Sequence, residues 1–464
     1  MNDYKTPGVY VEEKQRLPPS IASVETAIPV FVGYTQIAQW RQPDDLRNKP
    51  KRIVSMLEYV RFFGGPDPEK ESLSISIAGA DINVKVDESK RSKFLMYYSL
   101  QLFFANGGGP CWIISVEDYA TGGGLIENAK LKKGLAEAAK VNEITLLVFP
   151  DAINLEIATD YYDLYETAIT QCVTLQDRFT IMDVYHLPAN GDDWRLDIEL
   201  LRNTLSTDSL RLRYAAAYFP LIYTGVDFEY ANEAAIKIEG FAGATDLDGL
   251  KSVNNPFYAR AKNALTGAQL LLPASSAMAG IYARVDNSQG VWKAPANVNI
   301  LNAIAPQILI TNADQESLNV DVQAGKSINA IRSFEGRGPA IVWGTRTLDG
   351  NSNEWRYISV RRFFIMVEES TKNATEQFVF EANDRNTWVR IKSMIGNYLS
   401  QLYRDGALMG ASEQEAFFIH VGLNETMTEV DIWEGRLIIE IGMAVVRPAE
   451  FIILRFMHKM LNES

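Results

Sequence analysis

The stretch Arg436-Leu-Ile-Ile-Glu-Ile-Gly-Met-Ala-Val-Val446 decides how the end of this chain folds. Its even positions include Glu440, Gly442 and Ala444, while its odd positions carry only large apolar side chains. A period of two predicts a β-strand that is buried on one face. The apolar residues of that face are Leu437, Ile439, Ile441, Met443 and Val445.

A second strand is predicted close to the C-terminus. Arg447-Pro-Ala-Glu450 interrupts the first strand, because Pro448 cannot donate a hydrogen bond to a ladder. The apolar run Phe451-Ile-Ile-Leu-Arg-Phe-Met-His458 then favours a strand that must find a sheet edge. That edge can belong to the same subunit or to a neighbour.

The N-terminus has the same character. Pro7-Gly8 indicates a turn before a short strand that comprises Val9, Tyr10, Val11, Glu12 and Glu13. Two prolines at 18 and 19 favour extended backbone, so about 20 residues reach roughly 60 Å. Both termini are predicted to be arms that carry one strand each. Periodicity alone favours pairing of the two arms within one subunit over exchange with a neighbour.

Composition places the chain among folded proteins of two or three domains. It has 464 residues, of which 47% are hydrophobic and 22% charged, with a formal net charge of −13. The negative charge argues against nucleic-acid binding and against attachment to an anionic membrane. We expect no signal peptide, membrane anchor or membrane-spanning segment. Cys111 and Cys172 lie in apolar surroundings and are expected to be free thiols in the core.

The middle of the chain alternates between helical and strand patterns. This alternation predicts an α/β body with a mainly parallel sheet and helices on both faces. Residues 73–86 add a small β-hairpin, whereas residues 224–274 give no clear pattern. The predicted helices are 53–63, 93–106, 125–140, 160–175 and 197–204, and the predicted strands are 27–34, 111–116, 144–149, 179–184 and 214–219.

A second unit is predicted to begin at Ser327. It would contain strands at 328–334 and 340–348 and helices at 358–370 and 384–403, the last capped by Asp384 and stopped by Gly406. The expected fold class is α/β (α+β). The expected organisation is an N-terminal linker arm at 1–24, an α/β body at 25–326, a C-terminal α+β domain at 327–446 and an arm strand at 447–464.

No group of residues in the sequence predicts catalysis. The glycine cluster at 107–109 follows a helix and precedes a strand, which is the reverse of a phosphate-binding loop, and neither it nor the cluster at 122–124 carries a nucleotide-binding motif. His186, His420 and His458 have no metal-ligand spacing. We therefore expect no enzyme activity, catalytic residue, metal or cofactor. Arg346, Arg361 and Arg362 suit either ion pairs or anion binding.

Eight stretches, spread in order over the whole chain, carry a family resemblance. They resemble the signature of contractile tail sheath proteins, which occur in phage tails, R-type bacteriocins and extracellular contractile injection systems. The stretches are Thr6-Pro-Gly-Val-Tyr-Val-Glu-Glu13, Gly290-Val-Trp-Lys-Ala-Pro-Ala-Asn297, Ile328-Asn-Ala-Ile-Arg332, Val342-Trp-Gly-Thr-Arg-Thr-Leu348, Trp355-Arg-Tyr-Ile-Ser-Val-Arg-Arg362, Phe380-Glu-Ala-Asn-Asp384, Gly406-Ala-Leu-Met-Gly410 and Arg447-Pro-Ala-Glu-Phe451.

The resemblance implies a compact sheath subunit with an outer α/β body and an inner C-terminal domain. Such subunits stack as hexameric rings around an inner tube, start from a baseplate and end at a terminator or cap. They assemble in the bacterial cytoplasm as part of a phage tail or a phage tail-like particle. Contraction of the sheath drives the tube through a target envelope.

The resemblance also implies strand exchange between subunits, and so reverses the preference for pairing within one subunit. The strands exchanged would be Val9 to Glu13 and a C-terminal strand that includes Phe451, Ile452, Ile453, Leu454 and Phe456, and the receiving sheet would contain Leu437, Ile439, Ile441 and Met443. Candidate contacts with the tube or another subunit are Arg346, Arg361, Arg362, Trp388 and Lys392.

Two alternatives stay open. One is a minor sheath, terminator or baseplate-associated paralogue, which would be present in few copies. The other is an α/β enzyme that acts on a nucleotide or sugar, supported only by the alternating pattern of the body.

Overall fold

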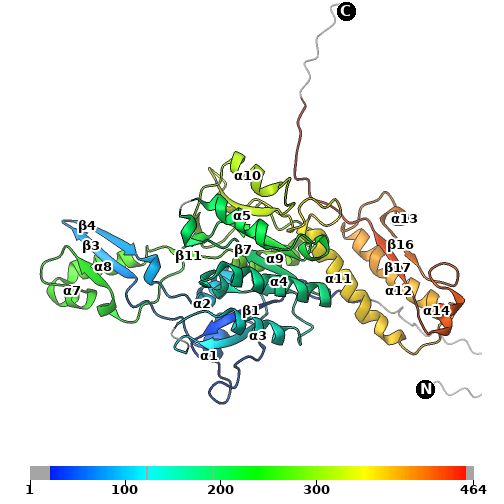
Figure 1. Ribbon diagram of the computed structural model, residues 1–464, viewed down its shortest axis with the longest axis horizontal. Coiled ribbons are helices and arrows are strands. Elements are labelled where there is room, and N and C mark those ends of the chain that lie inside the picture. Colours follow the sequence, from blue (N-terminus) through cyan, green and yellow to red (C-terminus); the bar gives the residue numbers. More distant parts are fainter. Residues whose placement is uncertain (1–20, 122–123, 192, 456–464) are drawn as a thin grey trace, which may run out of the picture. The chain divides into compact units, whose positions relative to one another are not determined.

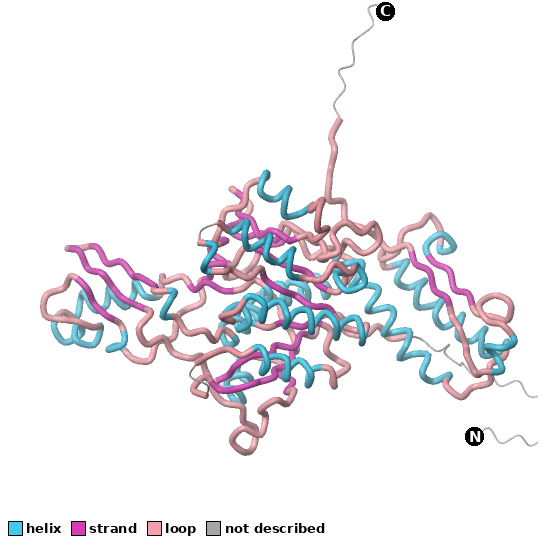
Figure 2. The backbone as a smooth tube through the Cα atoms, in the orientation of Figure 1, coloured by secondary structure: helices cyan, strands magenta, loops and turns pink. Residues whose placement is uncertain are grey.

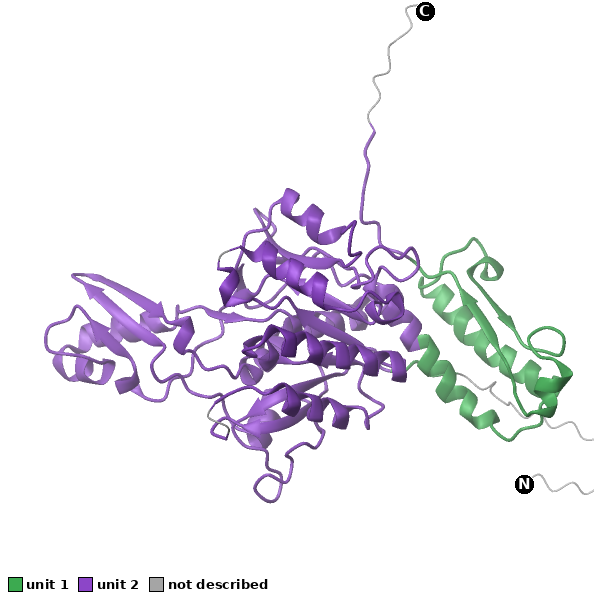
Figure 3. Ribbon diagram, viewed as in Figure 1, with its two compact units in different colours: residues 1–24, 367–446 green, residues 25–366, 447–464 purple. Residues whose placement is uncertain are grey.

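The computed structural model describes residues 21–121, 124–191 and 193–455 (Figure 1). The chain forms two compact units, coloured separately in Figure 3. Unit 1 comprises residues 1–24 and 367–446, and unit 2 comprises residues 25–366 and 447–464.

A nine-stranded sheet forms the centre of unit 2, in the order β12-β15-β14-β8-β7-β6-β1-β5-β2. The six strands from β14 to β5 pair in parallel, and the outer strands pair antiparallel. The predicted α/β fold with a mainly parallel sheet is therefore confirmed. The strands are β1 Pro29–Thr35, β2 Lys51–Ile53, β5 Cys111–Asp118, β6 Leu146–Val148, β7 Phe179–Asp183, β8 Ala215–Phe219, β12 Val298–Asn299, β14 Ile328–Phe334 and β15 Gly338–Val342.

Helices cover both faces of this sheet, as the alternation along β1 shows. The Phe31 ring lies 5.1 Å from the Phe103 ring of α2, whereas Gly134 of α3 lies against Val32. Successive side chains of a strand point to opposite faces, so α2 and α3 lie on opposite sides. The helices of the body are α1 Met56–Phe63, α2 Met96–Ala105, α3 Asn128–Ala138, α4 Ala158–Leu175, α5 Trp194–Thr204, α6 Ser209–Leu212, α9 Ser275–Gln289 and α10 Asn312–Asn319.

The segment that the sequence left unassigned contributes short strands to two small sheets. Strand β10, Lys237–Glu239, pairs in parallel with β3 of the predicted hairpin, and helices α7 and α8 accompany this sheet. Strand β9, Ile222–Thr224, lies between β11 and β13. Strands of three residues are too short to give a period. The other elements are β3 Leu73–Ala78, β4 Asp81–Val86, α7 Leu247–Val253, α8 Asn255–Leu265, β11 Leu270–Leu272 and β13 Ala303–Pro306.

The domain boundary expected at 327 does not coincide with the compact units. Strand β14 pairs in parallel with β8, so the strands expected to open the second unit belong to the large sheet of unit 2. The chain passes between units within helix α11, Ile358–Thr375. Short apolar strands carry no information about which sheet they join, and for that reason the sequence placed this boundary too early.

Unit 1 contains the last part of α11, helix α12 and a two-stranded sheet, which Figure 2 distinguishes by colour. Helix α12, Arg385–Arg404, begins where the Asp384 side chain accepts a hydrogen bond from the Thr387 N–H. Its apolar side, including Ile391, Ile395 and Leu399, is buried. The remaining elements are α13 Glu413–Ala416, α14 Glu429–Trp433, β16 Phe417–His420 and β17 Glu440–Met443.

Candidate assembly interface

The two-stranded sheet of unit 1 has its hydrogen bonds on one side of β17. Strand β17 pairs antiparallel with β16, with Phe418 opposite Gly442. The Ala444 N–H donates to the Ala416 carbonyl at 2.8 Å, and the Val446 N–H donates to the Ala407 carbonyl at 3.1 Å. The peptide groups of the even-numbered residues of this segment therefore face the rest of the chain.

The peptide groups of the odd-numbered residues face the opposite edge of β17, because they alternate along an antiparallel strand. Within the described ranges, β17 has no ladder partner other than β16. The expected receiving residues are half-buried on one face and lie at or next to this free edge: Leu437, Ile439, Ile441 and Met443. The predicted strand is confirmed over residues 440–443.

Among the described residues, the segment Phe451–Leu454 has no ladder partner within the subunit, so its pairing as a strand with a neighbour stays a prediction. Its four apolar side chains are 70–80% exposed. A strand requires a partner for its peptide groups, and the described part of this chain provides none for these residues. Phe456 and the predicted strand from Val9 to Glu13 lie outside the described residues.

The base of the C-terminal arm is fixed to unit 2 by Glu450. The Arg346 guanidinium donates to its carboxylate at 2.6 and 2.9 Å, and the Asn319 amide donates at 2.7 Å. Burial raises the pKa of Glu450, but the Arg346 and Asn319 hydrogen bonds lower it, and the net shift is downward. The exposed part of the arm therefore starts from an anchored residue.

The three arginines expected at a tube or subunit contact are buried, which contradicts that prediction. Arg346, Arg361 and Arg362 are 2–3% exposed. Arg362 pairs with Asp286, and the Arg361 guanidinium lies 4.7 Å from the centre of the Trp355 ring. The sequence places each arginine near aromatic residues, but it does not reveal which carboxylate or ring covers it.

Two other expected contact residues lie on α12. The Trp388 indole N–H donates to the Asn383 side chain at 2.7 Å. The Lys392 side chain is 50% exposed, with its ammonium 3.9 Å from a Glu425 carboxylate oxygen. Both remain predicted contact residues.

The carboxyl ends of parallel strands, where α/β enzymes bind their ligands, hold two buried aspartates. The Asp183 carboxylate accepts hydrogen bonds from the Ala274 and Ser275 N–H groups at 2.7 and 3.1 Å, at the start of α9. Burial raises the pKa of Asp183 to about 6, although these N–H groups act in the opposite direction. Its contacts attach a helix to the sheet.

Asp151 has the same arrangement one strand away. Its carboxylate accepts hydrogen bonds from the N–H groups of Tyr34, Leu95 and Met96 at 2.6–3.0 Å, and burial raises its pKa to about 7. Neither aspartate was singled out from the sequence, since an aspartate after a strand has no pattern that distinguishes an internal helix cap from a catalytic acid.

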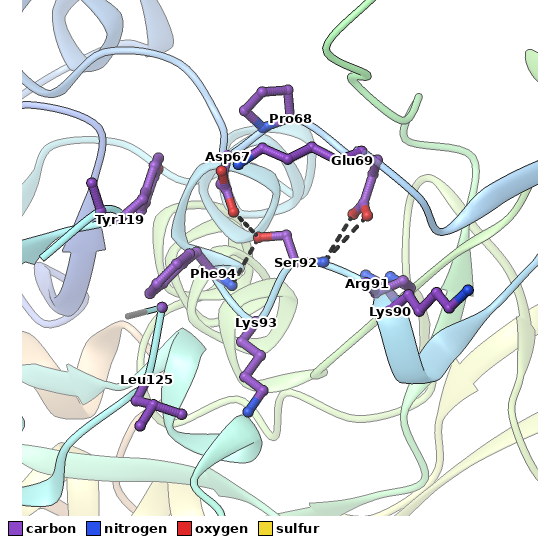
Figure 4. Close-up of a pocket in the computed structure, with 13 residues that line it drawn as sticks. Asp67, Pro68, Glu69, Lys90, Arg91, Ser92, Lys93, Phe94, Tyr119 and Leu125 are labelled. Carbon is purple, nitrogen blue, oxygen red and sulfur yellow. Dashed lines mark hydrogen bonds between the residues drawn. The ribbon is translucent and has the colours of Figure 1, made fainter. Parts of the chain in front are cut away.

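A cavity of about 450 Å³ lies beside the β3–β4 hairpin (Figure 4). Its buried acid, Glu69, accepts hydrogen bonds from the Ser92 N–H at 3.2 and 3.4 Å, while the Ser92 hydroxyl donates to Asp67 at 2.9 Å. Burial raises the pKa of Glu69. Both acids accept hydrogen bonds from Ser92 of the same chain, so their role is to hold two segments of the chain together.

The described residues offer neither a metal site nor a membrane-spanning helix. They contain no group of three or more histidine, cysteine or acidic residues that could hold a metal ion. None of their helices is long and apolar enough to cross a membrane. Cys111 and Cys172 are both buried and free, as expected.

The chain is similar in sequence and in fold to known proteins. Residues 351–458 match the phage tail sheath C-terminal domain. The chain is 30% identical to a chain of the anti-feeding prophage baseplate, with a TM-score of 0.63, covering 98% of this chain and 100% of that one. It is 28% identical to a chain of the contracted PVC sheath complex of an extracellular contractile injection system, covering 99% of both, with a TM-score of 0.63.

A curated relative, the tail sheath protein of Burkholderia phage BcepMu, is 28% identical over 148 residues. That stretch covers 31% of this chain and 31% of the relative's length. Together, the matched domain and the full-length structural relative show that the chain belongs to the contractile tail sheath family.

Proposed function

We propose that this protein is the structural subunit of a contractile sheath. Copies polymerise as stacked hexameric rings around an inner tube, from a baseplate to a terminator, and contraction drives the tube through a target envelope. The observation that carries this proposal is the free edge of β17 in a chain whose own C-terminal arm is apolar, exposed and unpaired in the described residues. Assembly would take place in the bacterial cytoplasm.

Strand exchange between subunits explains both the unpaired edge of β17 and the exposed apolar C-terminal arm. A neighbouring arm that joins the β17 edge satisfies its peptide groups and buries its apolar side chains at the same time. Main-chain hydrogen bonds can persist while the folded bodies rotate as rigid units, so the arms can act as hinges during contraction. Additional burial of roughly 100–150 Å² of apolar area per subunit, at about 25 cal/mol per Å², gives a few kcal/mol per copy. Summed over many copies, this burial can power contraction without a nucleotide.

A minor sheath or baseplate-associated component is the second candidate. One observation favours it: the relative that is 30% identical belongs to a baseplate assembly. Copy number distinguishes the two functions, because a minor component is present in about six copies per particle and a major sheath protein in hundreds. Quantitative mass spectrometry of the native particle measures this ratio.

Electron microscopy of the purified protein tests self-assembly. We expect negatively stained samples at high concentration to contain hollow striated tubes. A subunit that lacks residues 1–16 is expected to stay folded and soluble but to form no tubes, and Val11→Pro is expected to act in the same way because it removes a ladder N–H. Tubes of normal length from either variant would contradict strand exchange by the N-terminal arm.

A further inference from the structure

The loop before α12 contains a strained turn with an aromatic residue at its tip. The Glu381 N–H donates to the Phe378 carbonyl at 3.0 Å, which closes a four-residue turn. Val379 has φ −61° and ψ 129°, and Phe380 has φ +70°. These angles define a type II turn, whose third position requires positive φ and is normally glycine or asparagine.

Phenylalanine is unfavourable at this position. A bulky side chain at positive φ is a backbone outlier, and such strain persists where it serves a function. The Phe380 side chain is fully exposed, and that of Val379 is 61% exposed. Within the subunit, therefore, this turn has both the cost of a strained backbone and the cost of exposing two apolar side chains.

The chain just after this turn is hydrogen-bonded to the segment that leads into β17. The Asn383 side-chain amide donates to the Arg436 carbonyl at 3.0 Å, one residue before Leu437. A chain that pairs with β17 and extends beyond Glu440 toward Arg436 approaches the segment that carries this turn. The chain itself contains an exposed apolar segment of the matching chemistry, Phe451–Leu454.

We propose that Val379 and Phe380 form a docking surface for the C-terminal arm of a second copy of this chain, with Phe380 packed against Phe451–Leu454 of that copy. The inference rests on the proposed sheath function and adds a side-chain contact to it. The strained turn holds the aromatic ring outward before assembly, so the surface is ready to bind.

Glycine and alanine at position 380 separate strain from docking. Phe380→Gly removes the ring and also relieves the positive φ, so we expect its melting temperature to rise by about 2 °C. Phe380→Ala removes the ring but keeps the strain, so its melting temperature should not rise. Both variants should require at least about tenfold more protein for tube formation, because both lose the packed ring. Leu309→Ala is the control, since Leu309 is also exposed, at 73%, and should leave tube formation unchanged.

A photocrosslinker at the same position identifies the occupant. With p-benzoylphenylalanine in place of Phe380, we expect assembled tubes to give a crosslink to residues 451–455 of another copy. A crosslink to a tube protein, or variants that assemble normally alone but fail to hold the inner tube, would overturn the assignment to a second copy. Normal tube formation by Phe380→Gly would show that the turn has no docking role. Wild-type protein that never assembles would instead remove the proposed function, and this inference with it.

Discussion

The nine-stranded sheet of unit 2 and the two-stranded sheet of unit 1 differ in the edges that they present to another chain. The nine-stranded sheet ends in β12, which has two residues, and β2, which has three. Such short edge strands offer little to another chain. Counting the described residues alone, the sheet of unit 1 has two strands, and β17 presents an unpaired edge with half-buried apolar side chains on one face.

The difference separates a region that is complete in one subunit from a region that is not. In the large sheet, even the buried carboxylates of Asp151 and Asp183 are occupied by backbone N–H groups of the same chain. An isolated two-stranded sheet is marginally stable in water, so the small sheet gains most from a further strand. Damage to the large sheet should therefore unfold the subunit, whereas damage to the free edge of the small sheet should leave the subunit folded and prevent assembly.

Proline on β17 gives the largest expected effect. Met443→Pro removes an N–H that faces the free edge, and we expect tube formation to fall by at least about 100-fold while the melting temperature changes by only a few degrees, because proline is tolerated on an edge. Gly442→Pro is the matched variant, since the even-numbered peptide groups face β16. It should lower the melting temperature markedly, because it breaks the existing pair and places a Cβ against the Phe418 ring. Circular dichroism and electron microscopy measure the two properties.

The opposite results for Met443→Pro and Gly442→Pro would contradict the assignment of the two edges of β17. If Met443→Pro unfolded the subunit and Gly442→Pro left it folded, the free edge would be on the other side of the strand. If Met443→Pro assembled like the wild type, the β17 edge would not be where the copies join.

The fold could be predicted where periodicity is strong. The alternation in Arg436–Val446 and the helix–strand repeats of residues 93–219 gave the half-buried strand and the parallel sheet, because burial imposes those periods. The three-residue strands β9, β10 and β11 were not found, since three residues establish no period. The assignment of β14 to the large sheet depends on a pairing distant in sequence, which local patterns do not encode.

Periodicity also explains why only part of the candidate interface could be predicted. Strand β17 follows from its own pattern, whereas the burial of an arginine depends on the residues that surround it. Arg346, Arg361 and Arg362 were predicted at the surface and are buried instead, because Glu450, Asp286 and aromatic rings surround them. The positive φ of Phe380 leaves no trace in a sequence that lacks glycine at that position.

The buried Asp183 gives a second test of completeness in the large sheet. Because burial raises its pKa from 3.8 to about 6, ionisation of this carboxyl group is less favourable in the folded state. Its contribution to stability is therefore greatest below about pH 4 and declines as the pH rises to about 6. Relative to wild type, Asp183→Asn should gain up to about 3 kcal/mol in unfolding free energy between pH 4 and pH 7. Urea unfolding across this range measures the gain, and a difference between the two proteins that does not vary with pH would contradict it.

The smallest expected effect concerns Glu450, whose hydrogen bonds with Arg346 fix the base of the C-terminal arm to unit 2. Glu450→Gln keeps the size of the side chain but leaves the buried Arg346 without a counter-charge, so we expect a loss of about 2 kcal/mol in unfolding free energy at pH 7. Because the pKa of Glu450 is lowered in the folded state, its stabilising contribution is present above its ordinary pKa of 4.5 and is lost as the pH falls through its folded pKa. The difference in unfolding free energy between variant and wild type should therefore narrow below about pH 4.

Glu239→Gln is the control, because its partner Lys85 is 3.5 Å away and both side chains are more than 60% exposed, so a change within about 0.5 kcal/mol is expected. Equal losses in the two variants would mean that Glu450 is a surface charge and that the arm has no fixed base. A loss of stability confined to Glu450→Gln, together with weaker tube formation by the folded variant, would support a double role for the Glu450–Arg346 pair. The pair would stabilise unit 2 and also hold the base of the arm that binds a neighbouring subunit.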